Sequence, residues 1–249
     1  MREKNNVAVL VAAFLGEPET IQSKLTDRNI RYLHTKNAFL AMKNKLQNQS
    51  LYLGLVGDEG ECNRFITECN INESNAKWFD QDRALISRGT GALENQLIVK
   101  CIKNWSLEKK FDVVIKVTGK YEILNLNQII NFSQVTHQPF YAWRTFSNNM
   151  VDTRVFLFNP NFYLQNQIEL EKINSIPGFW MENIAFNLMK ERRFSFGFLS
   201  YRPILNGLGG TTNEFSTTPL YKRVLISYFT YINIIFTSAL NKLKLIFGE

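Results

Sequence analysis

Histidine and cysteine, two residue types that often mark a reactive site, are scarce in this chain of 249 residues. It has 2 histidines, His34 and His137, and 3 cysteines, Cys62, Cys69 and Cys101, none of which forms a CxxC pair. Two histidines exclude a His-rich zinc site, and we expect each to have a structural or surface role. The odd number of scattered cysteines is typical of reduced thiols in a cytosolic protein and argues against a disulfide framework.

Glycine, proline and long apolar runs are also scarce. The chain has 13 Gly and 6 Pro, and it shows no long linkers, repeats or low-complexity tracts. The apolar stretch behind the charged N-terminal residues is short and lacks a signal-peptide cleavage pattern, so we expect an intracellular protein. The composition is 45% apolar and 20% charged, which is typical of a globular chain long enough for a sizeable core.

The charge of the chain is positive but dispersed. The formal net charge is +7 at pH 7, and no basic tract is long enough to resemble a nucleic-acid tail. We therefore expect no nucleic-acid partner. A dispersed positive charge suits nucleotide phosphates and an anionic membrane surface equally well.

Strand and helix patterns alternate along the chain and predict an α/β fold, with a mostly parallel sheet flanked by helices. In the first half, strands are expected at 7–14, 51–56 and 111–121, helices at 18–31, 36–47, 61–69 and 88–105, and irregular structure at 70–88. In the second half, strands are expected at 138–144, 154–158 and 194–199, a helix at 179–190, and flexible loops at Asn148-Asn149 and around Gly207, Gly209 and Gly210.

The central strand ends at Thr118-Gly119-Lys120-Tyr121, and the rest of the chain is expected to be organised around it. Ligands of open α/β sheets bind outside the carboxyl ends of the strands, so a strand that ends in glycine and lysine indicates a site. This strand end is not a P-loop. Val114 stands where the first glycine of that motif would be, and Tyr121 stands where Ser or Thr would follow the lysine.

The segment Lys116-Val117-Thr118-Gly119-Lys120-Tyr121 resembles the Lys-x-[Ser/Thr]-Gly-[Arg/Lys]-Tyr segment of glycosyltransferases from bacterial capsule and lipopolysaccharide loci. The order of strands and helices before it is similar to the nucleotide-binding half of a GT-A glycosyltransferase, and the resemblance covers residues 7–215. It implies a GT-A-like, Rossmann-type domain at 1–217, divided into a nucleotide-binding half (1–125) and an acceptor half (126–217). It further implies transfer of a sugar from a nucleotide-sugar donor to a glycan or lipid-linked acceptor in bacterial surface polysaccharide synthesis.

The resemblance places the donor at the carboxyl ends of the strands. The residues expected to bind it are Asp58, Arg88, Gly89, Gly91, Lys116, Thr118, Gly119, Lys120 and Tyr121. Lys120 would balance the phosphate charge, and Gly119 would let the backbone approach closely. Plainer interpretations stay open: a solvated lysine at a turn, Asp58 as an ordinary turn residue, and a helix start capped by Thr90.

The chain departs from the GT-A pattern at the metal site. Most GT-A enzymes hold a divalent cation with an Asp-x-Asp pair at this strand end, and this chain has Thr118-Gly119-Lys120 instead. Without carboxylates there is little to hold a hard cation, which prefers oxygen ligands. We therefore expect donor binding without a metal ion, and no cofactor.

The resemblance also implies an Asp or Glu base in a late helix, because an alcohol attacks well only as it loses its proton. Glu182 fits this position, and Asp152 is the second candidate. Spacing does not decide between them, and a first-turn glutamate also suits the helix dipole. An alternative function of a different class is a noncatalytic adaptor of a polysaccharide assembly complex, which would keep the fold without the carboxylates.

Residues 218–249 predict a C-terminal amphipathic helix. Cations flank its apolar part, namely Lys222, Arg223, Lys242 and Lys244. Such a helix is typical of attachment to an anionic membrane surface through 220–249, and a helix packed in the core or in a homodimer fits the pattern equally well. The expected location is the cytoplasm, either free or peripheral on the inner face of the cytoplasmic membrane.

Overall fold

The computed structural model describes residues 4–15, 27–46, 49–80, 82–144, 150–191, 197–198, 202–208 and 215–217. The expected C-terminal helix at 218–249 lies outside the described residues, as do residues 18–26 of the first expected helix and the loop residues Asn148, Asn149, Gly209 and Gly210. Within the described ranges, none of the helices combines the length and the hydropathy that a membrane crossing needs.

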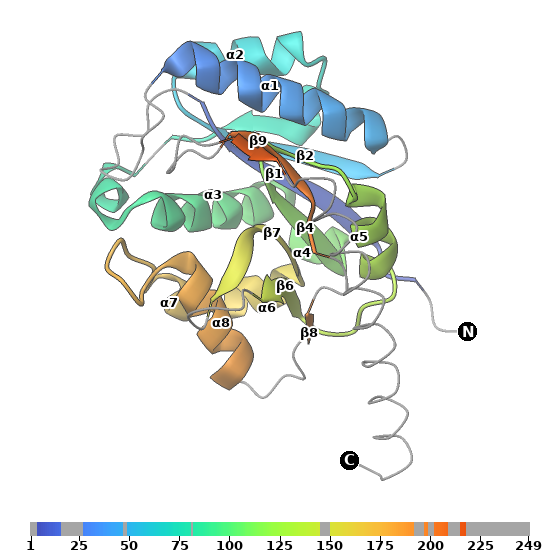
Figure 1. Ribbon diagram of the computed structural model, residues 1–249, viewed down its shortest axis with the longest axis vertical. Helices are drawn as coiled ribbons and strands as arrows, with labels where there is room; N and C mark the ends of the chain where they lie inside the picture. Colours follow the sequence, from blue (N-terminus) through green and yellow to red (C-terminus); the bar gives the residue numbers. More distant parts are fainter. Residues whose placement is uncertain are drawn as a thin grey trace.

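A seven-stranded sheet in the order β3-β2-β1-β4-β7-β6-β8 forms the centre of the fold (Figure 1). Its strands are β1 (Val7–Phe14), β2 (Ser50–Val56), β3 (Ala76–Trp78), β4 (Val113–Thr118), β6 (Phe140–Arg144), β7 (Val151–Phe158) and β8 (Gly197–Phe198). Neighbours among β3, β2, β1 and β4 are parallel, whereas β7 pairs antiparallel with both β4 and β6. The predicted α/β fold with a mostly parallel sheet flanked by helices is confirmed.

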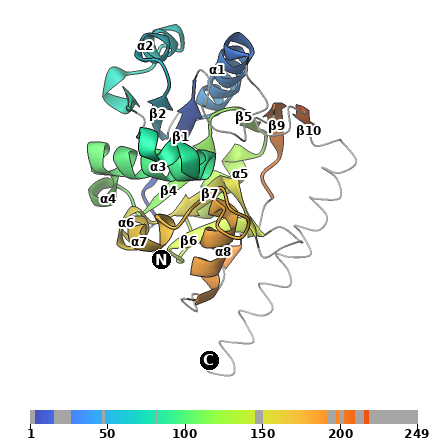
Figure 2. The ribbon, with the colours of Figure 1, turned by 90° about the vertical axis from the view of Figure 1, so that its left-hand side faces the viewer.

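Helices cover both faces of this sheet (Figures 1 and 2). One face is covered by α1 (Arg28–Lys45), α2 (Glu59–Glu68) and α5 (Leu126–Ser133), and the other by α3 (Thr90–Trp105), α4 (Leu107–Lys110), α6 (Pro160–Gln165), α7 (Gln167–Leu170) and α8 (Met181–Glu191).

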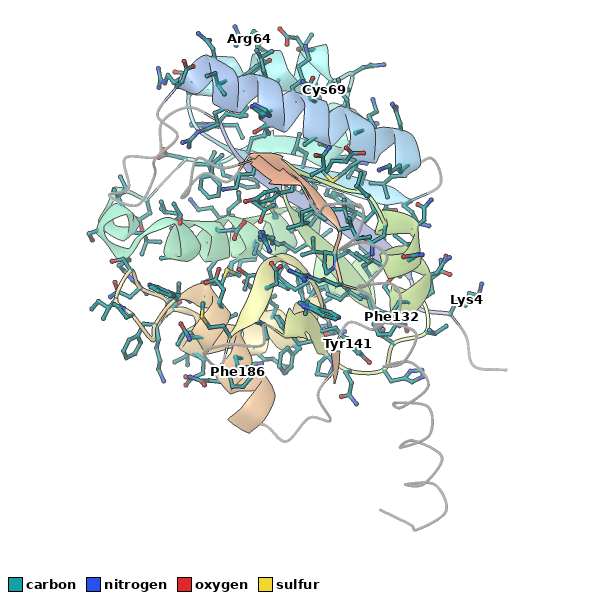
Figure 3. All side chains as sticks on the ribbon, viewed as in Figure 1. Lys4, Arg64, Cys69, Phe132, Tyr141 and Phe186 are labelled. Atoms are coloured by element: carbon teal, nitrogen blue, oxygen red, sulfur yellow. The ribbon has the colours of Figure 1, made fainter. Side chains whose placement is uncertain are left out.

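The buried side chains form two clusters because successive residues of a strand point to opposite faces. On β1, Val9 packs toward α1 and α2, and Leu10 packs toward α3. Side chains fill the space on both faces (Figure 3), where Cys69 belongs to the first cluster and Phe186 of α8 to the second.

A small antiparallel sheet lies over the end of the central strand. It consists of β5 (Tyr121–Ile123), β9 (Leu205–Leu208) and β10 (Phe215–Thr217), in the order β10-β9-β5. Gly207, which the sequence placed in a flexible loop, is part of β9 and pairs with Tyr121. A Cβ at Gly207 would collide with the carbonyl oxygen of Lys120. The glycine is therefore needed for close packing over the turn that follows β4.

Several local expectations are wrong, each for a simple reason. The helices expected to be separate at 18–31 and 36–47 meet in one helix, α1, because Tyr32 and Thr35 continue its buried face. The segment 70–88 contains a strand of three residues and two short 3₁₀ helices, Glu73–Asn75 and Arg83–Arg88, all too short to give a periodic pattern. Gly89, and not Thr90, is the cap of α3.

Candidate functional site

The carboxyl ends of β1, β2 and β4 lie side by side. Gly119 N donates to the Ala12 carbonyl oxygen at 2.8 Å, and Leu15 N donates to the Val56 carbonyl oxygen at 2.7 Å. A Cβ at Gly119 would lie 2.5 Å from the Cβ of Ala13, so a larger residue would push the end of β4 away from β1. This is the side of an open α/β sheet where ligands bind.

Lys116, on β4, is fully buried although lysine is normally exposed. Its Nζ lies 2.7 Å from Glu94 Oε1 on α3, and it donates at 2.8 Å both to Thr118 Oγ1 and to the carbonyl oxygen of Thr153 on β7. Desolvation lowers the pKa of Lys116, and the charge of Glu94 acts against that shift. Because an ammonium group has three hydrogens and each has an acceptor here, Lys116 has no donor left over for a ligand.

Hydrogen bonds continue from this lysine to Glu182. Thr118 Oγ1 donates to Glu94 Oε1 at 3.0 Å, and Thr153 Oγ1 donates to Glu182 Oε1 at 3.0 Å. Glu182 lies in the first turn of α8, where the helix dipole favours a carboxylate. It accepts no other hydrogen bond from the residues that the structure describes, so its second oxygen is available to a ligand.

Asp152, the second candidate base, is engaged with Arg154. The side chain of Asp152 is 7% exposed, and its oxygens accept from Arg154 Nε at 2.8 Å and Nη2 at 2.6 Å. Burial acts to lower the pKa of Arg154, but the hydrogen bonds and charge of Asp152 outweigh it, so that this pKa is raised. The guanidinium also lies 5.7 Å from the ring centre of Tyr121. Between the two candidates, this geometry favours Glu182 as a base.

Lys120 occupies the turn between β4 and β5 and is half-buried. Its Nζ lies 5.4 Å from the ring centre of Tyr121, and it has no hydrogen bond or ion pair with any described residue. Burial is the main cause that lowers the pKa of Lys120 to about 8; the charge of Glu94 acts against this shift, and the nearby cations Arg31, Lys116 and Arg154 act with it. A desolvated ammonium that forms no ion pair with a described residue, and that lies close to other cations, is a favourable position for an anion.

Asp58, expected beside the nucleoside, lies two residues after the end of β2 and is exposed. Its Oδ1 accepts a hydrogen bond from Glu61 N at 3.0 Å, which makes it the N-cap of α2. Trp78 Nε1 donates to the carbonyl oxygen of Gly57 at 2.8 Å and fixes the turn before it. Helix capping thus accounts for an aspartate here without a ligand.

Arg88, Gly89 and Gly91 link the start of α3 to the segment before α8. Arg88 donates from Nε and Nη2 to the carbonyl oxygen of Ile173, at 3.2 and 2.9 Å. Gly89 has a φ of 87°, a conformation that favours glycine. A Cβ on Gly91 would lie 3.3 Å from both Ile173 Cγ2 and Met181 Cβ. Packing and the bonds to Ile173 account for these three residues, and among the described residues no hydrogen bond links any of them to Lys120.

Two of the carboxylates near the strand end are paired with cations. Glu94 faces the buried Lys116, and Asp152 faces Arg154. Glu182, on α8, accepts a hydrogen bond from Thr153. In the part of the chain that the structure describes, no three His, Cys, Asp or Glu side chains are grouped for a metal ion.

An open pocket of about 460 Å³ lies elsewhere, at the amino end of β2. Its lining includes Lys43, Ser50 and Asn72, and none of the residues proposed for the donor. Lys43 Nζ donates to the carbonyl oxygens of Cys69 and Asn70. The pocket thus lies at the amino end of a parallel strand, whereas Lys120 follows the carboxyl end of β4.

Sequence reasoning missed Glu94 and Thr153. Glu94 interrupts an apolar helix face beside Leu93 and Leu97, and Lys116 interrupts an apolar strand. A buried cation needs a buried anion, so these two interruptions together were a usable signal. Thr153 acts partly through its backbone carbonyl, which leaves no trace in a sequence.

No protein-family model matches this chain, and no curated protein matches it. Similar solved structures include the glycosyltransferase GlyE of Streptococcus pneumoniae, at 11% identity and a TM-score of 0.46, covering 80% of this chain and 45% of GlyE. The galactosyltransferase LgtC, solved with donor and acceptor sugar analogues, is 8% identical with a TM-score of 0.48, covering 78% of this chain and 74% of LgtC.

A third similar structure is 4-diphosphocytidyl-2C-methyl-D-erythritol synthase of Anaerococcus prevotii. It is 10% identical with a TM-score of 0.45, covering 90% of this chain and 98% of the synthase. The chain spans less than half the length of GlyE, the first of these three proteins.

Proposed function

We propose that this chain is a GT-A-like glycosyltransferase, which moves a sugar from a nucleotide-sugar donor to a glycan or lipid-linked acceptor. The observation that carries the proposal is the half-buried ammonium of Lys120 at the carboxyl end of the central strand, which forms no ion pair or hydrogen bond with the described residues. Glu182 belongs to the hydrogen-bonded network at the same strand end. Glycosyl transfer needs such a pair of charges, a cation for the leaving diphosphate and a carboxylate for the proton.

In this proposal Lys120 contacts the donor diphosphate, and the close turn at Gly119 lets the backbone approach it. Lys116 and Glu94 are positioning residues, because they form an ion pair with each other and both are hydrogen-bonded to Thr118. Tyr121 and Arg154 form the wall beside Lys120. Donor binding then needs no divalent cation, since Lys120 supplies the positive charge.

The chemical step follows from these positions. An acceptor hydroxyl oxygen attacks the anomeric carbon of the donor, and the bond from that carbon to the phosphate oxygen breaks. The bonding electron pair leaves with the diphosphate, whose added charge Lys120 offsets. The hydroxyl proton passes to the carboxylate of Glu182, which Thr153 holds through a hydrogen bond at 3.0 Å.

The biological setting is also a proposal. The similarity of Lys116-Val117-Thr118-Gly119-Lys120-Tyr121 to glycosyltransferases of capsule and lipopolysaccharide loci supports a role in bacterial surface polysaccharide synthesis. Such donors are cytoplasmic, which agrees with the reduced cysteines expected from the sequence. Attachment to a membrane surface through 220–249 remains part of this proposal, on the sequence pattern alone.

Two variants test the proposal because they affect different steps. Lys120→Ala should weaken binding of UDP-, GDP-, CMP- or dTDP-sugars, measured by calorimetry, by about ten- to a hundredfold. Glu182→Gln should leave donor affinity unchanged and lower turnover by about 10²–10⁴. Matched controls are Lys77→Ala and Glu169→Gln, whose side chains are bonded elsewhere, to Asn104 and Lys172.

The outcomes separate the alternatives. Unchanged donor affinity in Lys120→Ala removes the phosphate site from the strand end. Normal turnover in Glu182→Gln moves the base to another residue. A native protein that binds no nucleotide sugar, or binds one without hydrolysing or transferring it, is instead the noncatalytic adaptor.

A further inference from the structure

The segment 174–180, which connects α7 to α8 and is called the α8 loop below, exposes large apolar side chains. Ile176 is 56% exposed, Phe179 48% and Trp180 38%. Single exposed apolar residues are ordinary on protein surfaces. A group of them in one short loop is unfavourable in water and marks a place where something binds.

The α8 loop is held in shape by its own hydrogen bonds. Asn174 N donates to the Phe179 carbonyl oxygen at 2.8 Å, and Phe179 N donates to the Ile176 carbonyl oxygen at 3.0 Å. Trp180 Nε1 donates to the carbonyl oxygen of Ser175 at 3.1 Å. The backbone of the loop and the side chain of Trp180 are thus placed before a ligand arrives, which reduces the entropy lost on binding.

Both ends of the α8 loop are fixed beside the candidate site. Ile173, at one end, accepts the two hydrogen bonds of Arg88, and it contacts the position of Gly91 together with Met181, at the other end. Glu182, the proposed base, follows Met181 directly. Figure 1 shows this loop at the same end of the molecule as the turn before α3. A ligand on the loop would therefore lie next to the reacting groups.

The charges around the α8 loop argue against an anionic ligand or membrane. Residues 167–182 carry Glu169, Glu171, Lys172 and Glu182, and Lys172 is paired, with its Nζ 2.6 Å from Glu169 Oε2. Arg88, which reaches this segment from the turn before α3, donates to the carbonyl oxygen of Ile173. A surface that attracts anionic lipid has unpaired lysines or arginines. Aromatic faces beside carboxylates and amides suit instead a neutral sugar, which has an apolar C–H face and hydroxyls that donate hydrogen bonds.

We propose that the α8 loop binds a neutral sugar ring of the acceptor, with Phe179 and Trp180 against its C–H face. This assignment rests on the proposed function and adds to it an acceptor subsite. The ring on the loop is a neighbour, within the same glycan, of the sugar whose hydroxyl reaches Glu182. The loop thereby selects glycans of more than one sugar over single sugars.

Saturation-transfer NMR with three neutral disaccharides, lactose, maltose and N,N'-diacetylchitobiose, tests this subsite at millimolar concentration. We expect transfer to at least one disaccharide. Trp180→Ala should weaken its binding by about two- to tenfold, and Trp180→Phe should restore most of it, since a ring is retained. Val135→Ala, at another exposed apolar residue, is the control and should bind normally.

Three results would overturn the subsite. They are the absence of transfer to every disaccharide, equal binding by Trp180→Ala, and sedimentation with phosphatidylcholine–phosphatidylglycerol vesicles that depends on Trp180. The last would assign the loop to a membrane. Calorimetry with nucleotide sugars separates this failure from failure of the proposed function, because donor binding through Lys120 does not need the α8 loop.

Discussion

The buried pair of Lys116 and Glu94 shows how one side chain can join three elements. A lysine in the middle of a sheet is costly unless its charge is paired and every hydrogen has an acceptor. Here α3 supplies the carboxylate, β4 the Thr118 hydroxyl and β7 the Thr153 carbonyl. We therefore expect the pair to fix the end of β4, which Lys120 follows in the turn.

Removing one member of this pair should be much worse than removing both. Lys116→Met keeps most of the volume but leaves Glu94 without its cation, so we expect the free energy of unfolding in urea to fall by about 3–5 kcal/mol. The double variant Lys116→Met/Glu94→Gln should recover much of that loss. A single variant as stable as the native chain would show that the pair does not stabilise the sheet.

Donor binding should decrease as the pH rises through about 8. Burial lowers the pKa of Lys120 to about 8, and only the protonated form attracts phosphate. Affinity is thus full below this pKa and is lost above it, and because a bound anion favours the charged lysine, the loss begins near the pKa of the free protein. Calorimetry on both sides of pH 8 measures the effect. Lys120→Arg should abolish this pH dependence, because a guanidinium stays charged; a dependence that persists in this variant belongs to another group.

At the scale of elements, β9 fixes the turn that carries Lys120. The strand approaches so closely that the carbonyl oxygen of Lys120 leaves no room for a side chain at Gly207. Asn206 Nδ2 also donates to Glu122 Oε2 at 3.2 Å, and Lys45 of α1 binds the other oxygen of that carboxylate at 2.7 Å. The donor turn is therefore supported from β9 and from α1.

Gly207→Val should move β9 away from this turn. We expect a loss of about 1–3 kcal/mol in the free energy of unfolding, from overpacking, together with weaker donor binding. Urea unfolding and calorimetry measure the two effects. Gly60→Ala is the matched control, since a Cβ there meets only the side chain of Asp58, at 3.2 Å. Donor affinity that stays normal in Gly207→Val would show that β9 does not support the turn.

Elements with a strong local pattern could be predicted, and elements defined by their neighbours could not. The β-branched run of β4 and the apolar periodicity of α3 are local signals, and both were found. Gly207 was expected in a loop because glycine is common there; the actual reason for it is the backbone of Lys120, distant in sequence. At the site, Lys120 was predicted from a sequence motif, and Glu182 was predicted from its position in a late helix. Glu94 needed its partner on another element to be recognised.

At the scale of the whole molecule, the charge of the donor has to be balanced by side chains alone. We expect affinity for the nucleotide sugar to be the same in EDTA as in magnesium or manganese, because the carboxylates nearest the strand end already face Lys116 and Arg154. Calorimetry in the three buffers measures this. Lys120→Ala is the informative control, since a metal ion that carried the phosphates would preserve its affinity. Binding lost in EDTA and restored by manganese would contradict the prediction.

The position of β7 has a consequence for how the protein is made. Strand β4 pairs with β1 on one side and with β7 on the other, so the nascent chain completes β4 well before its second neighbour leaves the ribosome. During that interval an apolar, β-branched strand has an open side, which is a template for association with other chains. Lys116 meanwhile lacks the carbonyl of Thr153. Synthesis of residues 151–158 therefore closes the sheet and supplies the last hydrogen-bond acceptor of Lys116 in one step. A ribosome stalled before these residues would hold an aggregation-prone chain.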